Sequence, residues 1–450
     1  VVNHFVYEFR GTPVMASDIA TVGTALEVAD GYKIQFDFYT TLALVLLFDF
    51  IIIGRVIKCE PVFKKGAHRL YGIAVMAVVS VVSFNCLVMT EFASNRGLYL
   101  SLFQPLRSYQ RYGSIACFAK SIELSVPEKP EEYSLEKVEE ITSKYESDTV
   151  DTSKKRPNVI TIINEAFSDP KVLADIKTNE DYMPFIHDLM ENGNTVSGTS
   201  YASIVGGQTA NTEYEFLTGN SMSFLPKGTV AFQVYMKHEM PSMVTELKSE
   251  GYTGNSATHL QKARNYNRDK AYPLLGFDKF YDYTNLGVPF VKMRNNATDQ
   301  CTYDNITHDY EQNREKSDAP YFAYTMTIQN HSSYDDTDYT FENPVKLTSM
   351  TLQPEAEQYL SLIKMSDDAL KDLIAYFEKV KDPVIIVLFG DHQPHLPDYF
   401  YQKVMGEMPD NLSQKDAMKR YQVPFMIRAN YDIQETEISQ ISINYLSTLM

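Results

Sequence analysis

The chain has 450 residues, 44% of them hydrophobic and 22% charged, which is enough to build a large core and more than one domain. Its formal net charge of −17 excludes nucleic acid as an expected partner, because proteins that bind the phosphate backbone present a basic face. The four cysteines show no CxxC spacing, so they predict neither a disulfide framework nor a zinc knuckle.

Two apolar runs near the start of the chain predict membrane spans. They cover about 38–57 and 71–89, and each is about as long as a bilayer core is thick. The short loop between them is rich in lysine and arginine, which by the positive-inside rule places it in the cytoplasm and places everything after the second run outside. Two buried core helices are the alternative interpretation. The sequence starts without an initiator Met and stops at YLSTLM, so we expect segments to be missing at both ends.

The remaining chain divides into a connector and a large domain. Residues 1–91 form the expected membrane region, with an outer loop at 1–37, and residues 92–156 are a polar, partly helical connector. From residue 157 short apolar runs alternate with amphipathic stretches, which predicts an α/β domain with a mostly parallel sheet over 157–450. Expected strands are 158–163, 321–328 and 383–389, and expected helices are MPFIHDLMENG, MPSMVTELKSEG and AEQYLSLIKMSDDALKDLIAYFEKV.

Each expected strand is followed directly by residues that can bind metal or phosphate. These are Asn164-Glu165, Gln329-Asn330-His331 and Gly390-Asp391-His392. Ligands in open α/β sheets sit beyond the carboxyl ends of the strands, so we expect these groups to meet in one place. Carboxylates and imidazoles suit Mn²⁺, Mg²⁺ or Zn²⁺, and the ligand types alone do not select among the three. Taken singly, the same residues could be an exposed loop acid and an ordinary turn.

The stretch SIVGGQTANTEYEFLTGN predicts a nucleophile. Its Gly206-Gly207 turn presents Thr209 just before an expected helix, where the amides and the helix dipole stabilise an alkoxide and attract a phosphoryl group. Metal coordination would lower the pKa of the hydroxyl further. The alternative is that Thr209 is a turn residue and that Thr212 with Glu215 forms a capping box.

A polar stretch at 259–268 could bind phosphate. It contains His259, Tyr266 and Arg268. Arginine offers a planar, bidentate grip on phosphate, and an aromatic ring beside it can pack against glycerol or a sugar. Exposed arginines on a helix face are the alternative.

The motifs NEAF, GGQTANTEYEFLTG, NYNRD followed by GFDKFYD, QNH and FGDHQP, in this order, resemble the lipoteichoic acid synthase family of Gram-positive bacteria. These proteins are phosphoglycerol transferases with a sulfatase-type outer domain of the alkaline-phosphatase superfamily. The resemblance covers most of 157–445, and the membrane portion is similar too. It implies a multi-pass protein of the cell membrane with an extracellular catalytic domain.

The resemblance also implies roles for individual residues. Glu165, Thr209, Asp391 and His392 would form the metal site, which usually holds Mn²⁺ in this family. Thr209 would take glycerol phosphate from phosphatidylglycerol, and a glycolipid or teichoic-acid acceptor would then receive it. The substrate group would contact Arg268, His331, His259 and Tyr266. The chain departs from the family pattern at Tyr266, where relatives often carry Trp, and after His331, where they commonly carry Pro.

Two other functions fit the same motifs. A phosphoethanolamine transferase also uses a Thr nucleophile and a lipid donor, but such enzymes typically have more zinc ligands and paired cysteines. A catalytically silent protein could keep the fold to bind glycolipid. Sulfatase activity is not expected, because TANTEY stands where the C/S-x-P-x-R motif would be required.

Overall fold

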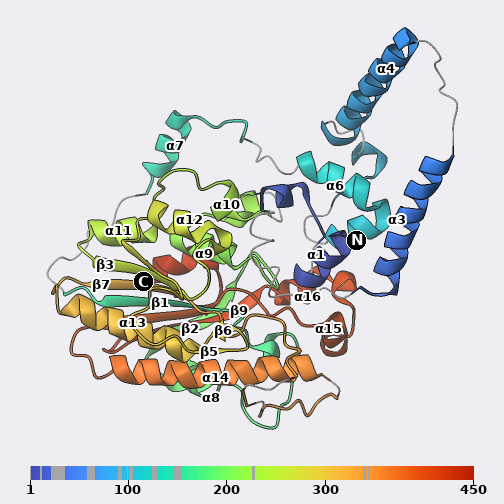
Figure 1. Ribbon diagram of the computed structural model, residues 1–450. Coiled ribbons are helices and arrows are strands. Elements are labelled where there is room, and N and C mark those ends of the chain that lie inside the picture. The colour runs from blue at the N-terminus through green and yellow to red at the C-terminus, as the bar shows by residue number, and fades with distance from the viewer. Residues whose placement is uncertain are drawn as a thin grey trace. The chain divides into compact units, whose positions relative to one another are not determined.

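The computed structural model describes residues 2–10, 13–21, 36–57, 66–89, 94–98, 100, 105–123, 129–145, 155–225, 229–337, 341–342, 344–351 and 353–450. It contains two compact units, drawn in Figure 1. The first unit is Val1–Pro127 with Leu225–Thr229, and the second unit is Glu128–Phe224 with Val230–Met450.

The first unit contains the expected apolar helices. Helix α3 (Phe38–Val56) is the one helix in the described part of the chain that is both long and apolar enough to cross a membrane. Its first turn is capped by Asp37, whose carboxylate accepts a hydrogen bond from the Thr40 amide at 2.7 Å. Helix α4 (Gly66–Phe84) has an apolar stretch of 17 residues, His68–Phe84, which is shorter than the run expected at 71–89. Large apolar side chains of both helices are exposed, which is typical of surfaces that face lipid.

The other described elements of the first unit are short. They are α1 (Val2–Arg10), η1 (Ala16–Thr21), the π-helix η3 (Asn85–Met89), η4 (Ser94–Arg96), α5 (Pro105–Tyr112) and α6 (Ser114–Glu123). Tyr109 of α5 packs with Leu100 and Cys117 in a small apolar cluster. Its hydroxyl donates a hydrogen bond to the Val14 carbonyl at 2.5 Å, and so ties α5 to the start of the chain. Much of the expected outer loop at 1–37, including residues 22–35, lies outside the described residues.

The second unit is built on an eight-stranded sheet with the order β10-β2-β9-β8-β1-β7-β3-β4. Only β9 runs antiparallel to its neighbours among these strands, so the sheet is mostly parallel, as expected. The strands are β1 (Asn158–Asn164), β2 (Thr195–Tyr201), β3 (Thr253–His259), β4 (Lys279–Tyr281), β7 (Tyr321–Met326), β8 (Val384–Gly390), β9 (Gln422–Ala429) and β10 (Thr436–Ser442). A separate pair joins β5 (Lys292–Met293) and β6 (Asn296–Ala297).

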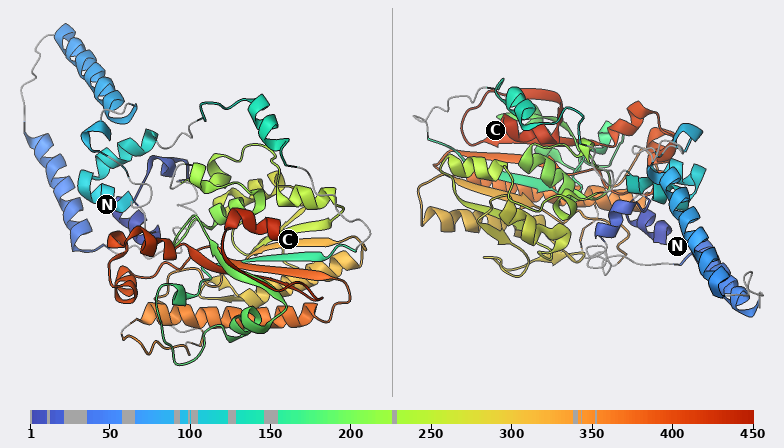
Figure 2. Two further views of the ribbon diagram at one scale, coloured as in Figure 1. Left: turned by 180° about the vertical axis from the view of Figure 1, so that it is seen from behind. Right: turned by 90° about the horizontal axis from the view of Figure 1, so that it is seen from above.

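Helices cover both faces of this sheet (Figure 2). On one face, α14 (Pro354–Phe377) packs against both α8 (Pro184–Asn192) and α13 (Asp299–Arg314). The other face carries α9 (Thr209–Thr218), α10 (Ala231–Val234), α11 (Met243–Ser249), α12 (Arg268–Leu274) and α17 (Ile443–Leu446), as Figure 1 shows. Two further helices, α15 (Asp398–Met405) and α16 (Gln414–Lys419), follow β8, and α7 (Leu135–Thr142) lies in the expected connector.

The sequence pattern explains this layering. All seven residues of β1 are buried, because helices cover both sides of the central strands, and this requires a continuous apolar run in place of an alternating one. The main core lies between the sheet and α8, α13 and α14. The three expected strands and the three expected helices are all present, with ends shifted by a few residues.

Candidate metal and phosphoryl-transfer site

The register of β1 and β8 places two carboxylates side by side. Asn164, the last residue of β1, pairs with Gly390, the last residue of β8, so Glu165 and Asp391 leave adjacent parallel strands at the same level. Position 390 has no room for a side chain, because a Cβ there would lie 1.8 Å from the carbonyl oxygen of Phe167. The close approach of these two chain segments therefore requires glycine at position 390.

Helix α9 brings Thr209 to these carboxylates. Gln208 adopts a left-handed backbone conformation with φ of 67°, and Thr209 is the first residue of the helix. The Thr209 hydroxyl oxygen lies 3.5 Å from Oε2 of Glu165 and 3.5 Å from Nε2 of His392. A hydroxyl at this position feels the positive end of the helix dipole.

The capping-box alternative is wrong. Gln208 caps α9 without a side-chain hydrogen bond. Thr212 lies one turn further on and donates its hydroxyl to the Asp391 carbonyl at 2.8 Å. Glu215 accepts from the Met222 amide at 2.7 Å instead of reaching back to the helix start. Thr212 thus ties α9 to the end of β8, which fixes Thr209 relative to Asp391.

His392 presents an acceptor nitrogen to the cluster. Its Nδ1 lies 2.8 Å from the carbonyl of Gln393, so Nδ1–H donates there, and in the neutral ring Nε2 carries a lone pair. Nε2 lies 3.1 Å from Oδ2 of Asp391 and 3.7 Å from Oε1 of Glu165. Oδ1 of Asp391 accepts from the Ala166 and His392 amides, whereas the buried Oδ2 has no donor among the described residues.

This donor set fits a divalent cation. One ligand atom each from Glu165, Asp391 and His392 lies within 4.8 Å of the others, and all three residues are buried. Burial, together with the charge of Asp391, raises the pKa of Glu165 well above its ordinary value, and burial raises the pKa of Asp391. Converging lone pairs without donors are unfavourable unless a cation lies between them. Glu165, Asp391 and His392 would hold such an ion with Thr209 as the fourth ligand.

Arg268 is buried and bonded to an acid that the sequence did not single out. Its Nε donates to Oε1 of Glu213 at 3.0 Å, its Nη2 donates to the same oxygen, and the pair is almost completely buried. Its guanidinium carbon lies 5.2 Å from the ring centre of Tyr266. Burial disfavours the charged arginine, but the Glu213 carboxylate outweighs this and raises the pKa of Arg268. The alternative of an exposed helix-face arginine is therefore wrong for Arg268.

His259 and His331 are two further expected substrate contacts, and burial keeps both imidazoles neutral. Burial and the charge of Arg268 lower the pKa of His259 well below its ordinary value, and burial lowers the pKa of His331. Nδ1 of His259 lies 3.2 Å from the Met326 carbonyl, and its buried Nε2 has no partner among the described residues. Nδ1 of His331 lies 2.7 Å from the carbonyl of Ser332. Both rings can therefore accept a proton or a hydrogen bond.

The amide side chains of Asn164, Gln329 and Asn330 lie in one buried network around Asp299, and none of their described hydrogen bonds reaches Glu165, Asp391 or His392. Asn330 donates to the Asn164 side chain at 2.9 Å and to Ser366 at 2.8 Å, while Asn164 donates to Asp299 at 3.1 Å. Gln329 accepts from the Asp299 amide at 3.1 Å. These side chains form a buried polar network behind Glu165. Its central acid, Asp299, lies at the start of α13, and no sequence motif marked it.

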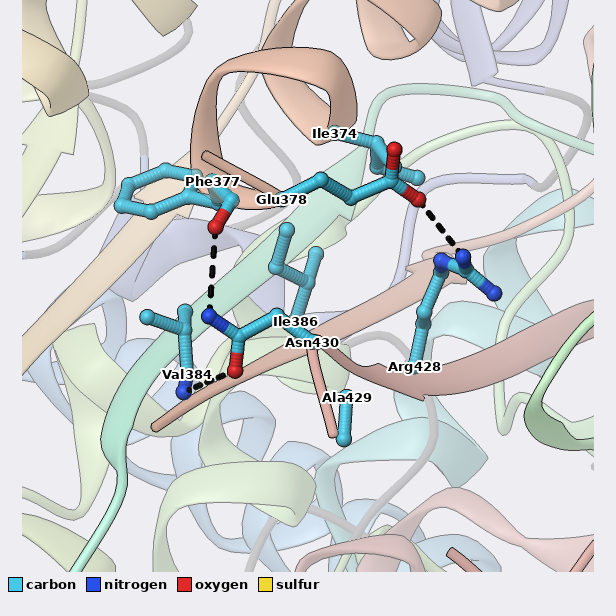
Figure 3. A pocket seen from close by; sticks show the side chains of 8 residues that line it. All are labelled: Ile374, Phe377, Glu378, Val384, Ile386, Arg428, Ala429 and Asn430. Atoms are coloured by element: carbon cyan, nitrogen blue, oxygen red, sulfur yellow. Dashed lines mark hydrogen bonds and ion pairs between the residues drawn. The ribbon is translucent and has the colours of Figure 1, made fainter. Parts of the chain in front are cut away.

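A separate hollow lies away from this cluster, at the amino end of β8 (Figure 3). Its rim carries an ion pair of 2.6 Å between Arg428 and Glu378. Asn430 closes it by accepting from the Val384 amide at 2.8 Å and donating to the Phe377 carbonyl at 3.2 Å. These bonds cap the end of α14 against the sheet. The hollow is structural and has no chemical relation to the site.

The fold and the buried cluster define an α/β protein of the alkaline-phosphatase type. The family model described as Sulfatase matches residues 157–450, and the chain belongs to this family.

Curated relatives support the resemblance to lipoteichoic acid synthases. The chain is 25% identical to lipoteichoic acid synthase 1 of Bacillus subtilis (strain 168) over 287 residues, which cover 61% of this chain and 42% of that protein. It is 29% identical to a putative cyclic β-1,2-glucan modification protein of Rhizobium meliloti (strain 1021) over 394 residues, covering 84% of this chain and 59% of the relative. The chain thus spans less than two thirds of these curated relatives.

Solved structures share the fold. The phosphoglycerol transferase GacH of Streptococcus pyogenes, in complex with sn-glycerol-1-phosphate, matches with a TM-score of 0.56 at 21% identity over 72% of this chain and 82% of that chain. The lipooligosaccharide phosphoethanolamine transferase A of Neisseria meningitidis matches with a TM-score of 0.55 at 11% identity over 98% of this chain and 80% of that chain. At such identities the likeness concerns the fold alone.

Proposed function

We propose that the chain is part of a membrane-anchored phosphoglycerol transferase that moves glycerol phosphate from phosphatidylglycerol to an acceptor in the cell envelope. The observation that carries this proposal is the meeting of the Thr209 hydroxyl with Glu165, Asp391 and His392 in one buried cluster. The relationship to lipoteichoic acid synthases supports the donor and the transferred group.

The chemistry is a double displacement at phosphorus. A divalent cation, Mn²⁺ in preference to Mg²⁺ or Zn²⁺, would lower the pKa of Thr209 and offset negative charge on the phosphoryl oxygens. Oγ1 of Thr209 bonds to phosphorus while the bond from phosphorus to the diacylglycerol oxygen breaks, and the hydroxyl proton ends on diacylglycerol. The acceptor hydroxyl then bonds to phosphorus, the Thr209–phosphorus bond breaks, and a proton returns to Thr209.

The surrounding residues bind and orient the phosphoglycerol group. Arg268 holds phosphoryl oxygens through its guanidinium, and Tyr266 packs beside the glycerol. His331, which burial keeps neutral, takes the proton of the attacking acceptor hydroxyl. His259 accepts a hydrogen bond from the substrate through Nε2, which has no partner among the residues that the structure describes.

The membrane region explains how the site meets its lipid. Helix α3 crosses the cell membrane, the apolar run at 71–89 makes the anchor multi-pass, and residues 157–450 work at the outer face. The acceptor is a glycolipid or a teichoic acid. The relative named as a glucan modification protein, which covers 84% of this chain, favours a cell-envelope glucan as the second candidate acceptor.

The test is lipid cleavage by the full chain in vesicles with Mn²⁺. Phosphatidylglycerol vesicles should release diacylglycerol, phosphatidylethanolamine vesicles should not, and Thr209→Ala should abolish release, while Thr209→Ser keeps a hydroxyl as the matched control. Trapping with acid should show phosphate on Thr209 of the wild type. Cleavage of phosphatidylethanolamine alone would make the protein a phosphoethanolamine transferase. A folded, metal-loaded chain that cleaves neither lipid would favour a glycolipid-binding protein.

A further inference from the structure

Glu213 occupies an unusual position for an acid. It lies one helical turn after Thr209 on α9, so both side chains project from the same side of the helix. The Glu213 side chain is completely buried, and four donor groups surround it. Oε1 accepts from the Nε and Nη2 atoms of Arg268, and Oε2 accepts from the hydroxyls of Tyr272 at 2.5 Å and Tyr324 at 3.2 Å.

These bonds leave one edge of the arginine for a ligand. The guanidinium of Arg268 is planar with donors on two edges, and Glu213 occupies the edge formed by Nε and Nη2. The other edge, formed by Nη1 and Nη2, has one hydrogen bond within the described part of the chain, a long one of 3.4 Å from Nη1 to the Asn265 carbonyl. The Tyr266 ring covers one face of the same group. Glu213, Asn265 and Tyr266 thus hold the guanidinium in place, and its Nη1–Nη2 edge can bind an anion.

We propose that Glu213 is a positioning residue that couples Arg268 to the helix carrying the nucleophile, and so aims the Nη1–Nη2 edge at the phosphoryl group on Thr209. The inference rests on the proposed phosphoryl transfer and assigns Glu213 no contact with substrate. Because Thr209 and Glu213 lie one rigid helical turn apart, the nucleophile and the Arg268 guanidinium keep the same relative position during both displacements. Misplacement by about 1 Å costs roughly 100-fold in rate in such sites.

Burial favours this role over a stabilising one. A fully buried acid–arginine pair is costly to desolvate, and apolar side chains of similar volume often stabilise a fold as well or better. The two tyrosines make the position specific, because they hold the carboxylate that holds the arginine. Glu215 offers the contrast: it is also buried on α9, but it bonds to Ser203 and the Met222 amide, away from Arg268.

The test is a double-mutant cycle in the full chain, with phosphatidylglycerol vesicles and Mn²⁺. Glu213→Gln should lower kcat by about 100-fold and keep KM within about threefold of the wild type. The reason is that the contact of Arg268 with the phosphoryl group is lost mainly in the transition state. In an Arg268→Ala background the same change should cost less than about threefold further. Mn²⁺ affinity, measured by calorimetry, should stay unchanged. Glu215→Gln is the matched control and should keep kcat within about threefold.

The outcomes separate the two proposals. An inactive wild type would overturn the proposed function, whereas an active wild type with an equally active Glu213→Gln would overturn the role of Glu213 alone. Independent, multiplying losses in the double variant would also overturn it. If Glu213→Gln does not fold, Tyr272→Phe and Tyr324→Phe each remove one bond to Oε2 and should lower kcat by about tenfold in a folded chain. Unchanged kcat in both would contradict the inference.

Discussion

Nε2 of His392 lies 3.1 Å from Oδ2 of Asp391, in a buried cluster at the carboxyl edge of the sheet. Oδ2 has no hydrogen-bond donor among the described residues, and Nδ1 of the imidazole is committed to the Gln393 carbonyl. When the imidazole is neutral, its Nε2 lone pair faces a carboxylate lone pair, which is repulsive in a buried site. A divalent cation that accepts both lone pairs makes the contact favourable.

We therefore expect Mn²⁺ to stabilise the fold. At 100 times its dissociation constant it should add about 2.7 kcal/mol to the free energy of unfolding, which chelation should remove. Thermal melts followed by circular dichroism, with and without EDTA, measure this. His392→Ala should abolish the response. His187→Ala is the matched control, because His187 also lies beside two carboxylates, Asp169 and Asp181, but outside the cluster. An equal melting temperature with and without metal would count against a metal site.

Gly390→Ala should damage the site and the fold together. The added Cβ would lie 1.8 Å from a backbone atom, the carbonyl oxygen of Phe167, so β8 must move relative to the chain after β1. We expect a loss of about 3 kcal/mol in the free energy of unfolding, and weaker Mn²⁺ binding because Asp391 follows directly. Gly54→Ala in α3 is the control, since nothing lies within 4 Å of its Cβ. A variant as stable as the wild type would show that the segments separate at little cost.

The sequence predicts the carboxyl-edge cluster because two simple rules apply there. Fully buried central strands require continuous apolar runs, and 158–163 and 383–389 are such runs. Parallel neighbours then deliver the residues that follow them to one edge of the sheet. Glu165 and Asp391 meet for this reason, and the register of Asn164 with Gly390 makes the match exact to the residue.

Other features depend on three-dimensional partners that spacing does not reveal. Glu165 follows β1 directly, whereas Asn330 lies further beyond the end of β7 and bonds to Asn164 and Ser366. Glu213 has the i, i+4 spacing from Thr209, which could have identified it as a residue on the nucleophile's side of α9. Its partner Arg268 comes from another element, so only the fold shows that the acid is paired.

Asp299 should make stability depend on pH. Burial raises its pKa from 3.8 to about 6, so the folded state favours its protonated form. The stabilising contribution is complete below about pH 4 and is lost as the pH rises through about 6, which amounts to about 3 kcal/mol. The free energy of unfolding of Asp299→Asn should therefore rise relative to the wild type by up to this amount between pH 4 and pH 7. Urea unfolding of the full chain in detergent measures it.

The control for this pH effect is Asp372→Asn, which removes an exposed acid on α14. Its free energy of unfolding should differ from that of the wild type by the same small amount at both pH values. A pH-independent difference between Asp299→Asn and the wild type would mean that the carboxyl group titrates alike in the folded and unfolded states.

Glu165→Gln should separate stability from metal binding. Burial and the neighbouring Asp391 make a carboxylate at this position costly without a cation, as the raised pKa of Glu165 indicates. The amide keeps the shape of the side chain but removes the charge. In EDTA the free energy of unfolding of the variant should therefore exceed that of the wild type by about 1 to 3 kcal/mol, and its melting temperature should be higher. With saturating Mn²⁺ the order should reverse, because the wild type gains the binding energy and the variant lacks a charged ligand. Melts of both proteins in the two conditions test this crossing, and a variant that is less stable than the wild type in EDTA would show that the carboxylate is held by hydrogen bonds and not by a cation.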